Sequence, residues 1–435
     1  MRHYSILLSL FVLLGCTSQP SAPQTVVSDD IERFWTAYDK IISTQDTTQQ
    51  LEYLSQLYLE PGSPGLKALM ERRGYTAQDY LEAIRNYPSF WASVRKNTLR
   101  SKEFADEIEA QIAQLKTIYP QLKPAKVYFT MGALMTGGTT LDSLVLIGSE
   151  IAMADSSVVT DEFPDWLGQN LRRYFDTNPI HDVALLNIHE YVHTQQNTYG
   201  YDLLSQSLFE GVAEFVSTKA IEKPSSAPAV NYGKNHEERV KQRFVKEMFS
   251  PNWDDWLYNN FENEFKVRDL GYFAGYAICE KYYEDAADKQ QAIREMIELD
   301  FGNQEAVENF VQKTGYFSES LGKLKQDFTS NRPEVVGIRP IANGAQNVDP
   351  TITEITVEFS VPMSKRFRGF EYGPLGEDHV LGVQAFNGFS EDGKTATFTV
   401  KMEPGQHYQL ELSPRFRTED GSPLEPYLID IQTKK

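Results

Sequence analysis

The sequence predicts a mainly helical domain with a small β-sheet over residues 29–330, followed by an all-β domain over residues 331–435. Three observations predict this arrangement. Apolar residues recur at helical spacing on both sides of residues 126–148. Residues 126–148 themselves contain β-branched and aromatic runs, which are typical of strands. After Pro333 the apolar period becomes two, which predicts further strands.

The composition fits folded domains and excludes one class of partner. The chain has 435 residues, of which 41% are hydrophobic, enough to build more than one core. Its formal net charge is −19. Binding of nucleic acid requires clustered Lys and Arg, so this acidity argues against a nucleic-acid partner.

Residues 1–15 are expected to form a signal peptide. A basic start precedes an apolar run, residues 6–14, that is far shorter than the ~20 residues of a membrane-spanning helix. The run ends in LLGC, residues 13–16, which resembles the lipobox of bacterial lipoproteins. That resemblance implies cleavage before Cys16 and lipidation of its thiol, so that lipid anchors the chain to a membrane of the bacterial cell envelope. Thr17 is not the Asp linked to inner-membrane retention in some bacteria, which favours the outer membrane. The alternative is an ordinary signal peptide with an accidental cysteine.

The helical domain is expected to begin after a short tether. Residues 16–28 are polar, contain prolines and lack periodicity. Asp29 with Glu32 then resembles a capping box, and Thr76 with Asp79 repeats this start signal. These first helices are expected to serve as a packing layer.

Two strand-like runs, KVYFT and SLVLIG, predict a small sheet of two or three strands. The connecting stretch MGALMTGGTTLD contains Gly137 and Gly138, which mark a turn, a bulge or the close approach of another backbone. The plain role of this sheet is to cover a helix layer. The alternative is an exposed edge strand along which an extended peptide pairs.

The stretch LLNIHEYVHTQQ carries the first chemical motif. Asn178 and Pro179 predict the start of its helix. His189 and His193 are four residues apart, so both imidazoles project from one side of that helix. Glu190 lies about 100° round the helix, where it can reach a water on the metal without ligating the metal itself. This is the HExxH pattern of zinc hydrolases, and the alternative is an amphipathic core helix with two buried histidines.

A second motif follows in SLFEGVAEF, residues 207–215, where Glu210 and Glu214 are four apart. Together the two motifs resemble the gluzincins, the clan of thermolysin-like and aminopeptidase-like zinc metallopeptidases. The resemblance implies that Glu210 ligates zinc beside the two histidines and that Glu214 accepts a hydrogen bond from a ligand histidine. Phe209 stands where those relatives usually carry Asn, and the chain has no G-x-M-E-N stretch. The resemblance covers roughly residues 125–285.

The expected chemistry follows from this ligand set. Catalytic zinc takes three protein ligands and lowers the pKa of its bound water to about 7. Glu190 would take the proton and pass it to the leaving amine. The oxyanion needs one further donor, and Tyr272 and Tyr276 are the candidates because they are four apart in LGYFAGYAICEKYY. His181 and His236 are further candidates, and the alternative for the tyrosines is simple core packing.

The all-β domain carries its own resemblance. TEITVEF, TATFTVKM and HYQLELS alternate, and Asp392 with Gly393 marks a hairpin turn. Strands of this kind predict a β-sandwich. The stretch RPIANGAQNVDPTITEITVEFSVPM is similar to the opening of bacterial Ig-like modules. That similarity implies a spacer, or a module that binds a surface partner, with no catalytic residue.

The sequence therefore predicts a lipid-anchored zinc metallopeptidase that hydrolyses peptide or protein substrates. The alternative is a non-catalytic envelope lipoprotein with a structural or remnant zinc site, whose Ig-like module binds partners. The number of protein ligands separates the two. A structural site has four, whereas a catalytic site has three and an open position.

Overall fold

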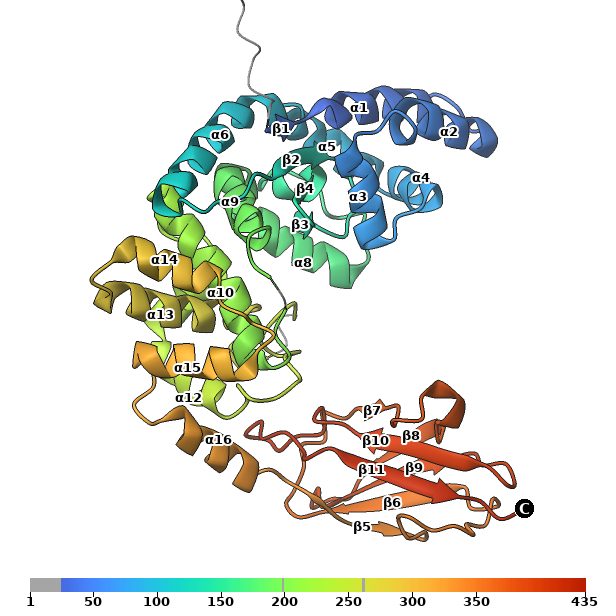
Figure 1. Ribbon diagram of the computed structural model, residues 1–435. Helices are drawn as coiled ribbons and strands as arrows, with labels where there is room; N and C mark the ends of the chain where they lie inside the picture. The colour runs from blue at the N-terminus through green and yellow to red at the C-terminus, as the bar shows by residue number, and fades with distance from the viewer. Residues whose placement is uncertain (1–24, 198, 260–262) are drawn as a thin grey trace, which may run out of the picture.

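A computed structural model describes residues 25–197, 199–259 and 263–435. The predicted order, a helical domain followed by a β region, is confirmed (Figure 1). One apolar core joins the helices to the first sheet, and a second core belongs to the β region alone. We call these parts the helical domain (residues 25–330) and the β domain (residues 331–435). Within the three described ranges, none of the helices has both the length and the apolar character needed to cross a membrane.

The first helices form a layer over one end of the helical domain. Their bounds are α1 (Asp29–Ile41), α2 (Thr47–Leu54), α3 (Pro64–Arg73), α4 (Ala77–Asn86), α5 (Pro88–Thr98) and α6 (Ser101–Ile118). The predicted capping box of Thr76 and Asp79 is confirmed at the start of α4. The box predicted at Asp29 is wrong, because Ser28 is the N-cap and the Glu32 carboxylate pairs with Lys102 instead of turning back on the helix start.

The first sheet is mixed, and its order is β1-β2-β4-β3. Its strands are β1 (Val26–Val27), β2 (Lys126–Thr130), β3 (Gly138–Leu141) and β4 (Leu144–Gly148). β1, β2 and β4 run parallel, whereas β3 lies antiparallel to β4 at the edge. The tether is shorter than predicted, because the edge of β2 offers backbone partners to β1 and so draws two apolar residues, Val26 and Val27, into the domain. Cys16 and the signal peptide lie outside the described residues.

The remaining helices build the centre of the molecule. They are α7 (Ser149–Ala152), α8 (Asp165–Phe175), α9 (Val183–His193), α10 (Leu203–Ile221), α11 (Pro228–Asn235), α12 (Glu237–Val245), α13 (Leu270–Asp285), α14 (Lys289–Ile297), α15 (Gln304–Thr314) and α16 (Leu321–Ser330). The predicted start of the HExxH helix is wrong. Asn178 adopts a left-handed φ of 55°, and residues 179–182 form a 3-10 turn before α9 begins at Val183. The Asn178 side chain accepts a hydrogen bond from the backbone of Ser156 and so does not cap α9.

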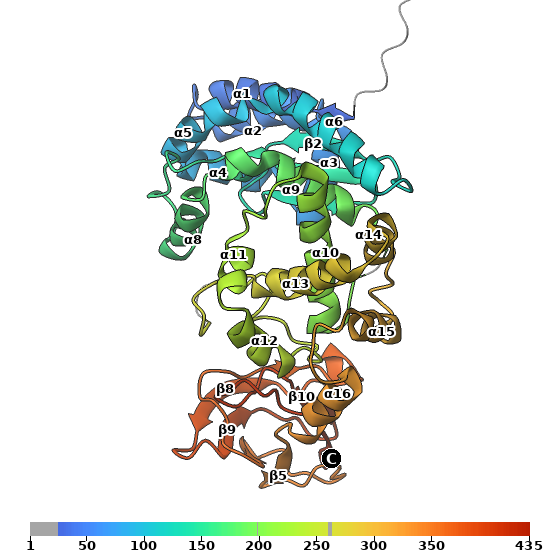
Figure 2. The ribbon, with the colours of Figure 1, turned by 90° about the vertical axis from the view of Figure 1, so that its left-hand side faces the viewer.

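The β domain consists of two antiparallel sheets that share one core (Figure 2). Their strands are β5 (Val335–Arg339), β6 (Glu354–Phe359), β7 (Phe370–Glu371), β8 (Val383–Phe389), β9 (Thr395–Val400), β10 (His407–Leu412) and β11 (Tyr427–Gln432). The orders are β5-β6-β9-β8 and β11-β10-β7. The hairpin predicted at Asp392 and Gly393 joins β8 to β9, with Gly393 at a φ of 72° that suits glycine.

Candidate metal centre

Two consecutive helices, α9 and α10, position the residues of the candidate metal centre. Ile188 and Val192 are fully buried and seat α9 in the core, which leaves the two histidines on a different side of the helix. Asp202 and Ser205 form a capping box that sets where α10 begins. The helix then carries Glu210 to α9, and nearly all of α10 is buried.

The three predicted ligands, His189, His193 and Glu210, converge on one point. The two histidine Nε2 atoms are 3.1 Å apart. Glu210 Oε2 lies 3.2 Å from Nε2 of His193 and 3.4 Å from Nε2 of His189. Tetrahedral zinc with bonds of about 2.0–2.1 Å spaces its ligand atoms about 3.3 Å apart, so these donors have the spacing that the ion requires. The group is therefore one that could hold a metal ion.

Hydrogen bonds behind the histidines turn both Nε2 atoms toward Glu210. His189 Nδ1 lies 3.0 Å from Glu214 Oε2, the partner that the resemblance implies. His193 Nδ1 lies 2.6 Å from the amide oxygen of Gln196. A ring that donates from Nδ1 keeps its Nε2 lone pair free for a metal. The rings are thus oriented before any ion binds.

The charges in the centre favour a cation. Burial lowers the pKa of His189, but the hydrogen bonds to Glu210 and Glu214 outweigh it and raise that pKa to about 10. Burial raises the pKa of Glu210, and the opposing pull of His193 and His189 takes it well below its usual range. The same negative charge that holds a proton on His189 attracts a divalent cation, which displaces that proton when it binds.

Glu190 lies off the ligand side of α9 and faces the first sheet. Its carboxylate approaches Gly138 on β3 so closely that a Cβ added to Gly138 would lie 2.8 Å from Glu190 Oε1. Glycine at 138 is therefore what admits the carboxylate to this position. Burial raises the pKa of Glu190, although His193 and His189 oppose the shift. The edge strand β3 and the carboxylate thus form one wall of the centre.

The two candidate tyrosines of α13 lie in different places. Tyr272 stacks over His189, with ring centroids 5.9 Å apart. Tyr276 instead packs edge-on against Phe215, 5.3 Å away, and Lys234 Nζ lies 4.7 Å above its ring. One further turn of α13 carries Tyr276 past the centre, so only Tyr272 reaches the predicted ligands.

Four residues of the centre were not anticipated as parts of it. The Tyr258 hydroxyl donates to Glu210 Oε1 at 2.5 Å, and the Ser225 hydroxyl donates to Glu214 Oε1. Gln196 orients His193, and Phe209 stacks on the His193 ring at 4.5 Å. Gln196 stands three residues after His193, a spacing that offered a signal. No motif marks Tyr258 or Ser225.

His181 and His236 do not join the centre. His181 is exposed on the 3-10 turn before α9. His236 is exposed and stacks on Tyr232, with ring centroids 4.1 Å apart. The stretch before His236, residues 223–233, contains the first turns of α11 and Ser225. The Ser225 hydroxyl donates a hydrogen bond to the Glu214 carboxylate, so this stretch helps to hold Glu214 in place.

Comparisons with known proteins identify no family. No protein-family profile matches the chain, and no curated protein sequence matches it. Among solved structures, the S-layer protein rSbsC(31-844) aligns at 16% identity and a TM-score of 0.18, over 64% of this chain and 39% of that protein. The N-terminal part of the bacterial S-layer protein SbsC aligns at 13% identity and a TM-score of 0.18, over 93% of this chain and 70% of that one. The chain thus spans well under half of the first of these proteins, and TM-scores this low carry no argument about fold or function.

Proposed function

We propose that this protein is a zinc-dependent peptidase. The observation that carries the proposal is the triangle of His189, His193 and Glu210, with donor atoms 3.1 to 3.4 Å apart. Within the described ranges the group has three members, which favours a catalytic over a structural zinc site. Glu190 stands beside this triangle without belonging to it, as a general base must.

Each residue of the centre has its own role in the proposed amide hydrolysis. Zinc, when bound, supplies a Lewis acid for the attacking water and for the scissile carbonyl. The Glu190 carboxylate takes a proton as the water oxygen bonds to the carbonyl carbon, and returns it to the amine as the carbon–nitrogen bond breaks. Tyr258 holds Glu210 in place through its hydroxyl. We assign the further hydrogen bond to the oxyanion to Tyr272, which is stacked over His189.

The edge strand β3 supports a peptide as the substrate. β3 pairs with β4 on one side, and no strand of the described chain pairs with its other side. An extended peptide added there would run alongside Gly138, the residue that the Glu190 carboxylate approaches. Such pairing uses the backbone of the peptide and does not depend on its side chains. It would hold a peptide bond near the Glu190 carboxylate, as hydrolysis of that bond requires.

The remaining parts of the proposal concern the location of the protein and the role of its β domain. We place the protein in the bacterial cell envelope, lipid-anchored through Cys16, with the outer membrane favoured. We also propose that the β domain is an Ig-like module, because its two antiparallel sheets enclose a single core. It would act as a spacer or bind a surface partner.

A metal analysis paired with a peptide-library digest tests the proposal. Purified protein should carry about one zinc per chain and cleave peptides, because three ligands leave one position open. His193→Ala should lose both zinc and cleavage. Glu190→Gln should keep its zinc and its fold while activity falls by about 10² to 10⁴.

Each alternative has its own result. Zinc at full occupancy in His193→Ala would remove the ligand assignment. Zinc without any cleavage by the wild-type protein would favour a non-catalytic envelope lipoprotein. Wild-type rates in Glu190→Gln would show that another residue is the base.

A further inference from the structure

Arg73, the last residue of α3, lies beside the edge strand of the first sheet. The helix α3 contacts β3, the strand whose Gly138 admits the Glu190 carboxylate (Figure 1). Nη2 of Arg73 donates a hydrogen bond to the Thr136 hydroxyl at 2.9 Å. That hydroxyl donates in turn to the Gly138 carbonyl at 2.6 Å. Two hydrogen bonds therefore link a guanidinium to the residue that the proposed general base approaches.

Arg73 forms no ion pair with any residue that the structure describes. Its side chain is half-buried, and its Nε is buried without a hydrogen-bond partner. Burial raises the pKa of Glu190, and Arg73 is one of several cations that oppose this shift without pairing with the carboxylate. A charge that is partly removed from water costs free energy unless it is paired. A carboxylate from a bound molecule would supply the missing partner.

The register of β3 shows which of its backbone groups face the open side of the sheet. Opposite residues of an antiparallel pair alternate between hydrogen-bonded and non-hydrogen-bonded pairs. The Gly148 amide donates to the Gly137 carbonyl, so this pair is hydrogen-bonded and the next pair, Gly138 with Ile147, is not. Gly138 and, two residues later, Thr140 therefore direct their N–H and C=O groups to the open side.

An extended peptide would pair with these two residues of β3, and Thr136 marks one end of that row. The Thr136 hydroxyl already bonds to the Gly138 carbonyl, and Arg73 holds the hydroxyl from behind. A peptide that pairs along β3 thus meets the guanidinium as soon as it passes Gly138.

The charge of Arg73 decides which end of the peptide lies there. Because β3 runs from Gly138 to Leu141, a peptide antiparallel to it has its carboxyl end toward Gly138. A parallel peptide would bring its amino end, and a guanidinium repels an ammonium group. A terminal carboxylate is attracted instead, and it matches the planar fork of an arginine.

We propose that Arg73 binds the terminal carboxylate of the peptide substrate and that the protein removes short fragments from the carboxyl end. The inference rests on the proposed peptidase function, since the metal centre must cleave the bond. Thr136 precedes Gly138 by two positions, and a strand advances about 3.3 Å per residue. One or two residues therefore fit between the bond at Glu190 and the carboxylate at Arg73. Each cleavage consumes one water and releases an amino acid or a dipeptide.

Peptides that differ only at the carboxyl terminus test this assignment. Zinc-loaded full-length protein digests one peptide sequence as the free acid and as the amide, and mass spectrometry identifies the products. We expect kcat/KM for the free acid to exceed that for the amide by about 10- to 100-fold, the factor that a hydrogen bond to a charged group contributes. The released fragments should be one or two residues long.

A variant and a matched control isolate Arg73. Arg73→Gln removes the charge but retains an N–H donor, so kcat/KM for the free acid should fall to that for the amide while the amide is cleaved as before. Arg72→Gln changes the neighbouring arginine, which is exposed and donates to the Tyr199 hydroxyl, and it should keep the preference. A purely structural role for Arg73 predicts that Arg73→Gln lowers both rates equally, which would overturn the inference.

Two other results would also overturn it. The first is equal rates for the free acid and the amide, or a preference that survives Arg73→Gln. The second concerns an amidated peptide that ends in Glu and so offers a side-chain carboxylate. Cleavage of this peptide as fast as the free acid would assign Arg73 to acidic side chains instead of the carboxyl end.

A binding measurement separates this inference from the proposed function. Fluorescent free-acid and amide peptides are titrated against zinc-loaded full-length Glu190→Gln protein, with and without Arg73→Gln. A free-acid preference that Arg73→Gln removes, in a protein whose wild type cleaves nothing, would sink the peptidase proposal while the carboxylate site stood. Cleavage in the middle of long peptides without such a preference would support the peptidase proposal and overturn this inference.

Discussion

The crossing of α10 and α13 lies directly beside the metal centre, because Gly211 of α10 follows the predicted ligand Glu210. Gly211 of α10 and Gly275 of α13 face each other there, backbone against backbone. A Cβ added to Gly275 would lie 2.6 Å from the carbonyl carbon of Ser207 and 2.9 Å from Cα of Gly211. Carbon atoms normally pack about 3.5–4.0 Å apart, so Gly275→Ala must push the helices apart by about 1 Å.

The cost of this displacement follows from the rigidity of the contact. Overpacking costs about 1–3 kcal/mol, and no side-chain rotation relieves a clash between two backbones, so the upper end applies. The better helix propensity of alanine returns at most about 1 kcal/mol. We therefore expect Gly275→Ala to lower the free energy of unfolding by about 2 kcal/mol or more, measured by urea denaturation followed by circular dichroism.

A matched control and a second variant complete the experiment. Gly322 of α16 has no atom within 4 Å of the position of an added Cβ, so Gly322→Ala should stabilise the protein slightly. Gly211→Ala makes the same clash one residue after Glu210 and moves a predicted ligand beyond the about 0.2 Å tolerance of a zinc site. Its zinc affinity should fall at least about 10-fold. If Gly275→Ala is as stable as wild type, the helices do not meet as closely as described and the reasoning fails.

Three further predictions concern other parts of the chain. Glu210→Ala should abolish zinc binding in equilibrium dialysis, whereas Glu214→Ala should weaken it only about 10- to 100-fold, and the reverse order would exchange their roles. Cys16→Ser should release the protein from the membrane fraction or leave its signal peptide uncleaved, and a processed variant that stays membrane-bound would refute the lipid anchor. Burial outweighs the neighbouring arginines and raises the pKa of Glu247 to about 7. Because this folded pKa lies above the unfolded value, the free energy of unfolding should fall by about 3 kcal/mol as the pH rises from about 4.5 to about 7. Glu247→Gln should lack that fall in urea titrations across the same range, and parallel curves for the two proteins would contradict the assignment.

Local sequence patterns were sufficient for the order of the helical and β regions and for the principal motif, although not for the start of every element. The period of α9 places His189 and His193 on one side because an α-helix repeats every 3.6 residues wherever it occurs. The box of Thr76 and Asp79 started α4 as predicted, because capping joins residues three apart. The same rule failed at Asp29. The Glu32 carboxylate, which was expected to close that capping box, pairs instead with Lys102, a residue far along the chain.

Only the tertiary structure decided which other side chains meet the metal centre. Tyr258 bonds to Glu210 across 48 residues of sequence, and Ser225 reaches Glu214 from a different element. Tyr272 and Tyr276 have the same helical spacing as the two histidines, yet the crossing of α13 over α10 brings only the first to His189.

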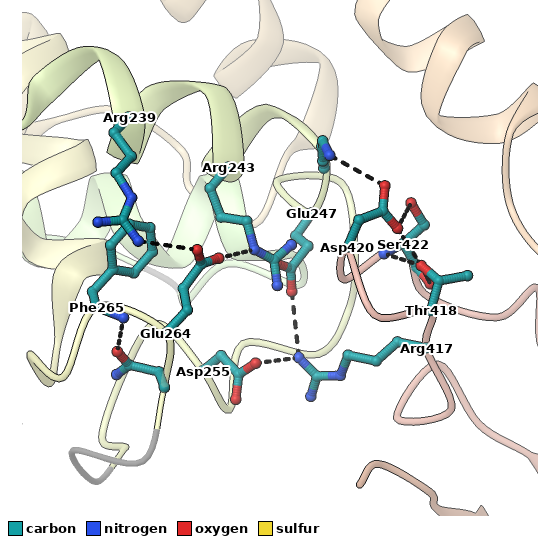
Figure 3. Close-up of polar contacts among 12 residues, drawn as sticks. Arg239, Arg243, Glu247, Asp255, Glu264, Phe265, Arg417, Thr418, Asp420 and Ser422 are labelled. Carbon is teal, nitrogen blue, oxygen red and sulfur yellow. Dashed lines mark hydrogen bonds and ion pairs between the residues drawn. The ribbon is translucent and has the colours of Figure 1, made fainter. Parts of the chain in front are cut away.

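The contact between the domains shows the same division. The sequence by itself determined that the chain is acidic and that a β domain follows the helices. It held no indication that Arg417 of that domain pairs with Asp255 and Glu247 of the helical domain, because no short-range period relates them (Figure 3). Spacing along one helix is a property of the backbone, whereas the approach of separate elements depends on the packing of whole cores. The sequence therefore determined the helices and the motif, and packing decided which residues surround them.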